Sequence, residues 1–326
     1  MIESKTTPPS DLSNQVVALL ALDDPSVTFE FDWHGFPIPV RFKRGNAEAQ
    51  ALIISFHGAV DRATREVPAF IPFMPELSPR THQLSVSDPT IMLREDIAIA
   101  WYAGFEGFDL QTALRAILAE IIVQLAVKRP IFFGTSGGGF AALFQGWHVE
   151  GSVMIVGNPQ TDILKYYDSH KKAYLETCWP QLDGPEALSH HICTNVCALY
   201  SKKFAREVIY VQSTTDEFHT LNHMLPFVAA ARASNMKKLI LESGFWGKFT
   251  HGPTPEAYRP WLHTVAGIQT ANKNAILESR KLMDLARNNS TEPAPGRSRE
   301  TVKGTNNSDI QISDAIREWQ LDTFKS

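Results

Sequence analysis

Apolar and polar positions alternate with two different periods along the first half of the chain. Residues 27–31 and 38–42 alternate with a period of two on either side of a WHG turn, which predicts a β-hairpin. The runs at residues 51–56 and 97–102 are apolar almost throughout, as expected of strands that are buried on both faces. Residues 110–125 repeat apolar side chains at helical spacing, which predicts a long amphipathic helix.

The second half of the chain continues this alternation of strands and helices. Strands are predicted at residues 152–156, 208–212 and 238–242, and helices at residues 223–234 and from residue 254 onward. Buried strands that are separated by helices are typical of α/β proteins, in which helices cover both faces of a mostly parallel central sheet. This architecture is the expected fold class.

The predicted organisation is one α/β domain with an insertion and a polar tail. Residues 1–24 form an N-terminal lead-in, and residues 25–287 form the domain. Residues 162–206 lie between two predicted strands and carry enough aromatic and leucine side chains to form a helical lid over a pocket. Residues 288–326 begin with a polar sequence typical of a disordered linker. They end in a short amphipathic segment, residues 308–322, which is expected either to dock on the domain or to contact a partner.

Composition argues against several classes of function. With 35 acidic and 31 basic residues, the net charge of -4 offers no electrostatic case for nucleic-acid binding. No apolar run approaches the roughly 18 residues that a membrane-spanning helix needs, and the N-terminal sequence lacks the apolar core of a secretory signal. Three cysteines do not make a disulfide framework. A cytoplasmic protein without a transmembrane segment is therefore expected.

A glycine-rich stretch, GTSGGGF at residues 134–140, lies between two apolar runs. Such a loop either cradles a phosphate or turns sharply enough to expose Ser136 as a nucleophile. A phosphate loop needs Lys followed by Ser or Thr after its last glycine, and a dinucleotide-binding loop needs glycine where Ser136 stands. Neither requirement is met. Residues 134–138 instead match G-x-S-x-G, in which a strained strand-to-helix turn lifts the serine hydroxyl clear of the sheet.

A serine nucleophile needs a histidine base and an orienting carboxylate, and both follow in the expected chain order. Asp216 lies in the loop after one predicted strand, and His251 lies in the loop after the next, just before a helix. His219 is the rival base. It is only three residues from Asp216, so it is expected to be hard to aim at Ser136. The alternatives for the acid are Glu217 and Asp162.

The remaining requirement is a pair of backbone donors for the oxyanion. The N–H of Gly137 is one expected donor, and the N–H of Ala59 or Gly58, after the buried strand at residues 51–56, is the other. The neighbouring His57 is expected to shape this loop without transferring protons. The residues expected to line the substrate pocket are His57, Thr135 and His219.

These features resemble an α/β-hydrolase over about residues 25–265. The resemblance rests on the motifs FHGA, GTSGGG, STTDE and FTHG. It implies a Ser-His-Asp triad and acyl transfer through a serine ester, and no cofactor is expected. Gly139, a third glycine in the first helical turn, departs from the common pattern. The segments SDPTIM, WYAG and NPQTD are also similar to those in bacterial enzymes of surface-polysaccharide biosynthesis that carry this fold.

Three functions agree with these motifs. The first is an esterase-type serine hydrolase. The second is an acyltransferase or deacetylase that acts on saccharide hydroxyls, and the third is a non-catalytic fold member that binds a partner. A zinc site is a weaker possibility, because its spacing matches no common signature and free cysteine is commonly buried. No metal is therefore expected at the residues concerned, which are His190, His191, Cys193 and Cys197.

Overall fold

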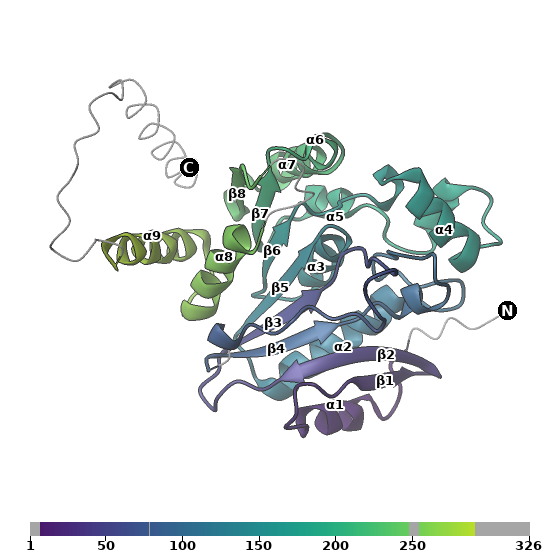
Figure 1. Cartoon of the computed structure of the whole chain (residues 1–326), viewed down its shortest axis with the longest axis horizontal. Helices are drawn as coiled ribbons and strands as arrows, with labels where there is room; N and C mark the ends of the chain where they lie inside the picture. Colours follow the sequence, from purple (N-terminus) through teal and green to yellow (C-terminus); the bar gives the residue numbers. More distant parts are fainter. Residues whose placement is uncertain (1–6, 78, 248–253, 291–326) are drawn as a thin grey trace.

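The computed structural model describes residues 7–77, 79–247 and 254–290, and an eight-stranded sheet forms their centre (Figure 1). Its strands are β1 (Phe29–Trp33), β2 (Phe36–Lys43), β3 (Ala51–Phe56), β4 (Thr81–Val86), β5 (Arg129–Thr135), β6 (Val153–Gly157), β7 (Glu207–Ser213) and β8 (Leu239–Gly244). The strand order is β1-β2-β4-β3-β5-β6-β7-β8. The pairs β1–β2 and β2–β4 are antiparallel and the other neighbours are parallel, so the predicted mostly parallel sheet is confirmed.

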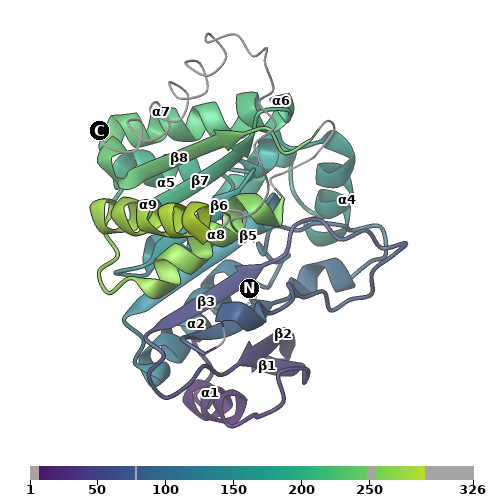
Figure 2. The same ribbon diagram turned by 60° about the vertical axis from the view of Figure 1, so that its left-hand side comes forward.

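Helices cover both faces of the sheet, as predicted (Figure 2). One face carries α1 (Leu12–Leu20), α2 (Leu110–Leu125), α3 (Gly137–His148), α5 (Val196–Lys202) and α7 (Leu225–Ser234). The other carries α8 (Pro255–Gly267), against which α9 (Lys273–Ser290) packs. Successive strand residues point to opposite faces, so Ile54 joins the first core and Ile53 the second.

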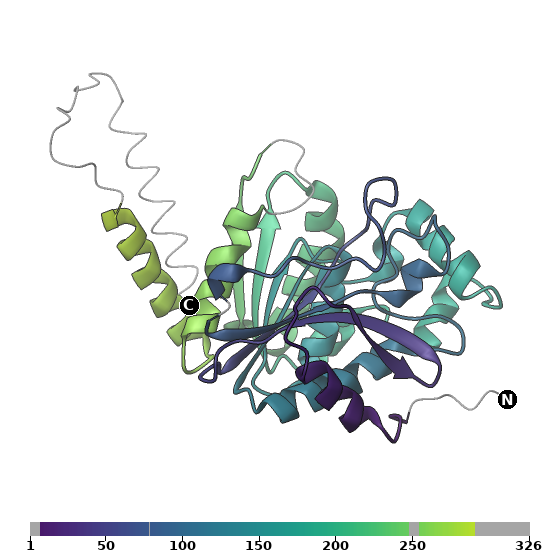
Figure 3. The same ribbon diagram turned by 60° about the horizontal axis from the view of Figure 1, so that its bottom comes forward.

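Within the N-terminal lead-in, α1 is packed on the domain. Its buried side chains are Leu12, Val16 and Leu19, and α1 lies against α2 (Figure 3). Burial of an apolar stripe of this kind stabilises a short helix that would be marginal alone.

The insertion between β6 and β7 is helical. It contains α4 (Asp168–Cys178), α5 and the short 3₁₀ helices η3 (Ile163–Lys165) and η4 (Pro185–His190). Tyr174 on α4 is fully buried, and its hydroxyl donates a hydrogen bond to the carbonyl of Gly104. The insertion is therefore packed against the loop that precedes α2.

The prediction of a strand at residues 97–102 is wrong. Trp101 and Tyr102 both have φ near 55°, in the left-handed region that a strand does not use. Their side chains are 1% and 2% exposed, so the apolar character of this segment reflects burial in an irregular loop.

The strand that the sequence pattern missed is β4, which lies between β2 and β3 in the centre of the sheet. A segment at residues 69–77 crosses one face of β4 and forms hydrogen bonds with the polar side chains on that face. The side-chain amide of Gln83 exchanges two hydrogen bonds with the backbone of Met74, at 2.8 and 2.9 Å. The hydroxyl of Ser85 accepts a bond from the N–H of Ile71 at 2.9 Å. The pattern missed β4 because its buried positions include polar side chains, which these hydrogen bonds satisfy.

The predicted start of a helix near residue 254 is confirmed by α8. The predicted helix at residues 223–234 is α7, and it is preceded by α6 (Glu217–His219) and a π-helical turn, η5 (Thr220–Met224). None of the helices described has both the length and the apolar character needed to cross a bilayer. The expected linker at residues 288–326 begins inside α9, which continues to Ser290. Its remainder and the segment at residues 308–322 lie outside the described residues, so the partner contact stays a prediction.

Candidate active site

Ser136 lies at a sharp turn between β5 and α3, at the carboxyl edge of the parallel strands. Its backbone has φ 54° and ψ −123°, a strained conformation for a residue with a side chain. The N–H of Ser136 donates to the carbonyl of Gly157 at the end of β6, at 3.0 Å. The first residue of α3 is Gly137, whose N–H the helix leaves without an intrahelical partner. This geometry is that of a nucleophile elbow.

The glycines around Ser136 are required by close backbone approaches. A Cβ atom on Gly134 would lie 2.2 Å from the carbonyl oxygen of Gly138, and one on Gly138 would lie 2.1 Å from the carbonyl oxygen of Phe56. A Cβ atom on Gly139 would lie 2.5 Å from the Cβ of Pro159. The third glycine therefore lets the loop after β6 approach the start of α3.

Gln160, in this loop, contacts the side chain of Ser136 directly. Its Nε2 donates a hydrogen bond to Ser136 Oγ at 3.0 Å, and its Oε1 accepts one from Trp101 Nε1. Gln160 is fully buried. Burial raises the pKa of the Tyr166 hydroxyl to about 12, while its hydrogen bonds with Gln160 and Ser136 act in the opposite direction. Ser136 Oγ is thus held by polar side chains from the loop after β6 and from the insertion.

Sequence reasoning missed the role of Gln160. The segments NPQTD and WYAG, which carry Gln160 and Trp101, stood out only as a resemblance, without any assigned chemistry. A buried amide has no characteristic spacing from a serine in the sequence. The one indication in the sequence that Gln160 lies near Ser136 was that NPQTD and WYAG both occur in this chain.

Asp216 lies just after β7, at the first turn of α6. Its Oδ1 accepts a hydrogen bond from the backbone N–H of His219 at 3.0 Å, and its Oδ2 accepts one from Asn158 Nδ2 at 2.8 Å. The ring Nδ1 of His219 lies 2.9 Å from Oδ2. Burial alone would raise the pKa of Asp216, but the hydrogen bonds from His219 and Asn158 outweigh it and lower the pKa to about 2. Asp216 is therefore a buried carboxylate at neutral pH.

The two alternative acids have other positions. Asp162 caps η3 by accepting a hydrogen bond from the N–H of Leu164 at 2.9 Å, and it accepts another from Asn195 Nδ2 at 2.9 Å. Glu217 is exposed. These contacts favour Asp216 as the acid because its carboxylate is the buried one beside a histidine.

The expected base, His251, lies outside the described residues. The loop that leads to it begins beside Asp216, because the hydroxyl of Thr215 donates to the carbonyl of Gly247 at 3.3 Å. The rival base, His219, is fully buried and its ring centroid is 5.2 Å from that of His223.

His57 and the loop after β3 form the other side of the site. The Nε2 of His57 accepts a hydrogen bond from the N–H of Asp88 at 3.1 Å, so Nδ1 carries the proton that is donated to the carbonyl of Gly58 at 2.7 Å. Burial lowers the pKa of His57 to about 4, so the ring is neutral at pH 7. A Cβ on Gly58 would lie 3.3 Å from the Cβ of Ser136. Gly58 thus allows the backbone of this loop, which continues to Ala59, to approach Ser136 closely.

A cavity of about 350 Å³ opens beside Ser136. It includes the expected pocket residues His57 and Thr135 and the loop that is expected to supply an oxyanion donor. Its lining residues are His57, Gly58, Ala59, Arg65, Phe70, Ile71, Pro72, Thr135, Ser136 and Tyr258. His219 is not among these lining residues.

Cysteine and histidine side chains form no metal centre in the described part of the chain, where no group of three or more His, Cys, Asp or Glu side chains is placed to hold an ion. Burial raises the pKa of Cys193 and of Cys197 to about 11, so both stay protonated thiols at neutral pH. Protonated thiols are poor metal ligands.

Comparisons with known proteins bear on the fold. No family model and no curated protein matches the sequence. Among solved structures, the chain is similar to the capsule O-acetyltransferase of Neisseria meningitidis serogroup A, with a TM-score of 0.50 and 16% identity over 73% of this chain and 97% of that chain. It is also similar to an acylaminoacyl peptidase of Pyrococcus horikoshii, with a TM-score of 0.51 and 12% identity over 87% of this chain and 45% of that chain. An S-formylglutathione hydrolase from Agrobacterium tumefaciens gives a TM-score of 0.49 and 13% identity over 69% of this chain and 87% of that chain.

Proposed function

The chain has the α/β-hydrolase fold, and we propose that it is a serine hydrolase of esterase type that cleaves an ester through an acyl-serine on Ser136. The observation that carries this proposal is the elbow itself. Ser136 holds a strained φ of 54° and opens onto a cavity of about 350 Å³. Backbone strain of this kind is maintained where it positions a reacting group.

In the proposed mechanism, His251 removes the proton from Ser136 as Oγ attacks the substrate carbonyl. Asp216 orients His251 and stabilises the imidazolium that forms. The low pKa of Asp216 keeps the carboxylate ionised for this purpose. The protonated His251 gives this proton to the alcohol oxygen as the ester C–O bond breaks, so the alcohol leaves and the acyl-serine remains. His251, now neutral, takes a proton from water as the water attacks the acyl-serine, and returns it to Ser136 Oγ as the acid is released.

The oxyanion is bound by two backbone N–H groups, those of Gly137 and of Ala59 or Gly58. Support comes from the position of Gly137 at the N-terminus of α3, where free N–H groups favour negative charge. Gly58 packs against Ser136, as the short distance of 3.3 Å from its hypothetical Cβ to the serine Cβ shows. Donors on both sides of the nucleophile are what a tetrahedral intermediate requires.

Gln160 is proposed to hold Ser136 Oγ in place during both half-reactions. Its amide donates to a lone pair of Oγ at 3.0 Å, which leaves the hydroxyl proton directed elsewhere, toward the base. A donor at this position also stabilises the negative charge that develops on Oγ when the acyl-serine breaks down.

A second candidate function is transfer or removal of an acyl group at a saccharide hydroxyl. It is favoured by the motifs SDPTIM, WYAG and NPQTD and by the likeness to a capsule O-acetyltransferase over 97% of that chain. Acyl transfer and hydrolysis share the acyl-serine and differ in whether water or a sugar hydroxyl accepts the acyl group. Analysis of the products with and without sugar acceptors distinguishes the two.

The test is labelling with a fluorophosphonate probe, which reacts with activated serines. The wild-type chain is expected to label at Ser136, as identified by mass spectrometry of the labelled peptide. Ser136→Ala is expected to abolish labelling and ester turnover without loss of the fold. Ser201→Ala, on the exposed side of α5, is the matched control and should label normally. Absence of labelling in the folded wild type would instead favour a non-catalytic, partner-binding role.

A further inference from the structure

The described residues that line the cavity beside Ser136 include one charged side chain, which is positive. Arg65 is the one ionised side chain among its described lining residues. His57 also lines the cavity, but burial lowers its pKa to about 4, so its ring is uncharged at pH 7. The other lining residues include four with apolar or aromatic side chains, Phe70, Ile71, Pro72 and Tyr258.

Arg65 is positioned to act on a ligand in this cavity. It is exposed, and its guanidinium donates one long hydrogen bond of 3.4 Å to the carbonyl of Phe70. No ion pair joins Arg65 to a carboxylate in the described parts of the chain. The charge of Arg65 acts on the site, because it lowers the pKa of His57. Burial lowers this pKa more strongly, and the hydrogen bond to Gly58 raises it.

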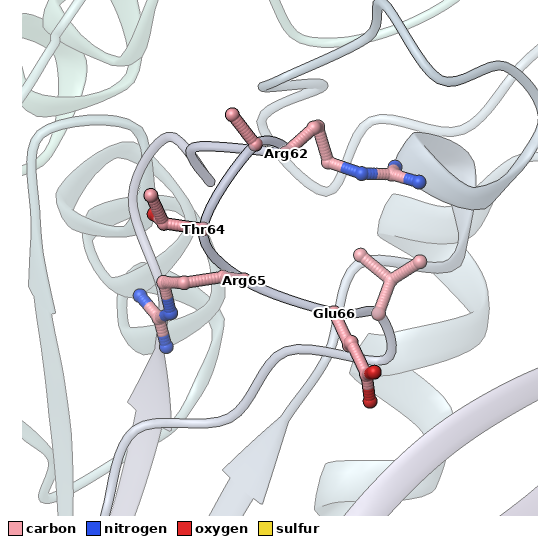
Figure 4. Close-up of a pocket in the computed structure, with 6 residues that line it drawn as sticks. Arg62, Thr64, Arg65 and Glu66 are labelled. Carbon is pink, nitrogen blue, oxygen red and sulfur yellow. The ribbon is translucent and has the colours of Figure 1, made fainter.

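The neighbouring acidic residue does not neutralise Arg65. Figure 4 shows the loop of residues 62–67, where the side chains of Arg65 and Arg62 extend to opposite sides and that of Glu66 extends in a third direction. Arg62 is held in the protein by a hydrogen bond, which its Nη1 donates to the carbonyl of Ile91 at 2.7 Å. Only Arg65 belongs to both the cavity beside Ser136 and the hollow of about 490 Å³ that residues 62–67 line.

From these observations we infer that Arg65 binds an anionic group, a carboxylate or a phosphate, on the alcohol or thiol part of the ester substrate. The carbonyl of the substrate lies at Ser136, and the part beyond the ester bond extends along the cavity toward the hollow that Arg65 borders. The guanidinium is suited to this role because it binds carboxylate and phosphate oxygens with two parallel N–H groups. The inference rests on the proposed function and specifies its substrate class.

The experiment compares matched esters that differ in one charge. The carboxylate pair is 4-acetoxybenzoate and its methyl ester, and the phosphate pair is 4-acetoxyphenyl phosphate and 4-acetoxyanisole. The value of kcat/KM is measured for each ester with wild type, Arg65→Gln and Arg115→Gln. Arg115 on α2 is a matched control, because it is also exposed and also makes one long side-chain contact, 3.5 Å to Thr112 Oγ1. Circular dichroism checks that each variant is folded.

In wild type and Arg115→Gln, the anionic ester of at least one pair is expected to be preferred, and the preference should weaken as salt is raised. Arg65→Gln is expected to lower the anionic-to-neutral ratio about tenfold, through loss of kcat/KM for the anionic ester alone. The pair that responds identifies the anion as carboxylate or phosphate.

Equal loss for neutral and anionic esters in Arg65→Gln, or no preference in wild type, would overturn the inference while leaving the proposed hydrolase intact. If wild type turns over none of the esters, protection against fluorophosphonate labelling provides the readout. Benzoate and phenyl phosphate should then slow labelling of wild type more than that of Arg65→Gln. Wild type that neither labels nor turns over any ester would overturn the proposed function and this inference together.

Discussion

The side-chain amide of Gln160 donates a hydrogen bond of 3.0 Å to the hydroxyl oxygen of Ser136, and the indole N–H of Trp101 donates to the other end of the same amide. The indole fixes the amide orientation, because only Oε1 is able to accept its proton. Ser136, the proposed nucleophile, is thus positioned by a side chain from the loop after β6, in addition to the triad proposed for it.

Gln160→Ala is expected to lower kcat for a simple acetyl ester about tenfold, since one hydrogen bond to the reacting oxygen contributes about 1 to 1.5 kcal/mol. The rate of fluorophosphonate labelling should fall in parallel. Trp101→Phe keeps the ring and removes the N–H that orients the amide, so a smaller loss is expected. A wild-type kcat in a folded Gln160→Ala variant would show that the contact has no catalytic role.

Substitution of the two candidate bases, His251 and His219, is expected to reduce kcat by different amounts. His251→Gln is expected to reduce kcat by about 10³-fold or more, as for loss of a triad base. His219→Gln should retain activity within about tenfold, because His219 contributes to the surroundings of Asp216 rather than to proton transfer. Steady-state kinetics of both variants decides between them. If the larger loss occurs in His219→Gln, the base has been assigned to the wrong residue.

Gly138→Ala is expected to destabilise the protein by about 3 kcal/mol or more, because its Cβ would lie 2.1 Å from the carbonyl oxygen of Phe56, a backbone atom. Gly267→Ala is the control. It has no neighbour within 4 Å of the new Cβ, so its stability should change by less than about 1 kcal/mol. Chemical denaturation measures both. A Gly138→Ala variant as stable as wild type would show that the elbow relaxes easily.

Buried histidines predict how stability depends on pH. Burial lowers the pKa of His57 from 6.5 to about 4 and that of His223 from 6.5 to about 3. Below pH 6.5 these groups therefore bind protons in the unfolded chain but not in the folded one. The stability that each contributes is fully present above pH 6.5 and is lost as the pH falls toward the folded pKa, by about 1.4 kcal/mol per pH unit for each group.

The measurement is the free energy of unfolding between pH 6 and pH 4.5. In His57→Asn the slope should be smaller than in wild type by about 1.4 kcal/mol per pH unit, whatever the loss in absolute stability. The exposed His190 provides the control variant, His190→Asn, which should keep the wild-type slope. An unchanged slope in His57→Asn would contradict a neutral, buried ring.

Most of the sheet and its helices were predictable because burial imposes a period on the sequence. Residues 110–125 show the helical period and form α2, and residues 51–56 are apolar except for Ser55 and form β3. The same reasoning fails at residues 97–102, whose apolar side chains are buried while the backbone turns at Trp101 and Tyr102. The apolar composition of residues 97–102 correctly indicates that they are buried. Their backbone angles depend on tertiary contacts, which composition does not indicate.

The candidate site was predictable to the extent that its chemistry has a sequence signature. Ser136 has one, because the elbow demands glycines at fixed positions, and Asp216 has one through its place after a strand. Gln160 and Arg65 have none. Their importance comes from where the loops after β6 and β3 lie relative to Ser136, and no local pattern records that distance.

The polar strand β4 has a consequence for how substrate range changes during evolution. Phe70, Ile71 and Pro72 line the cavity. The hydroxyl of Ser85 on β4 accepts a hydrogen bond from the N–H of Ile71, and the hydroxyl of Ser87, just after β4, accepts one from the N–H of the adjoining Ala69. A mutation in the middle of the sheet, at a residue outside the cavity lining, is thus able to move these lining residues while Ser136 stays in place. New specificities are therefore accessible through interior positions that a mutagenesis library confined to the cavity surface would never sample.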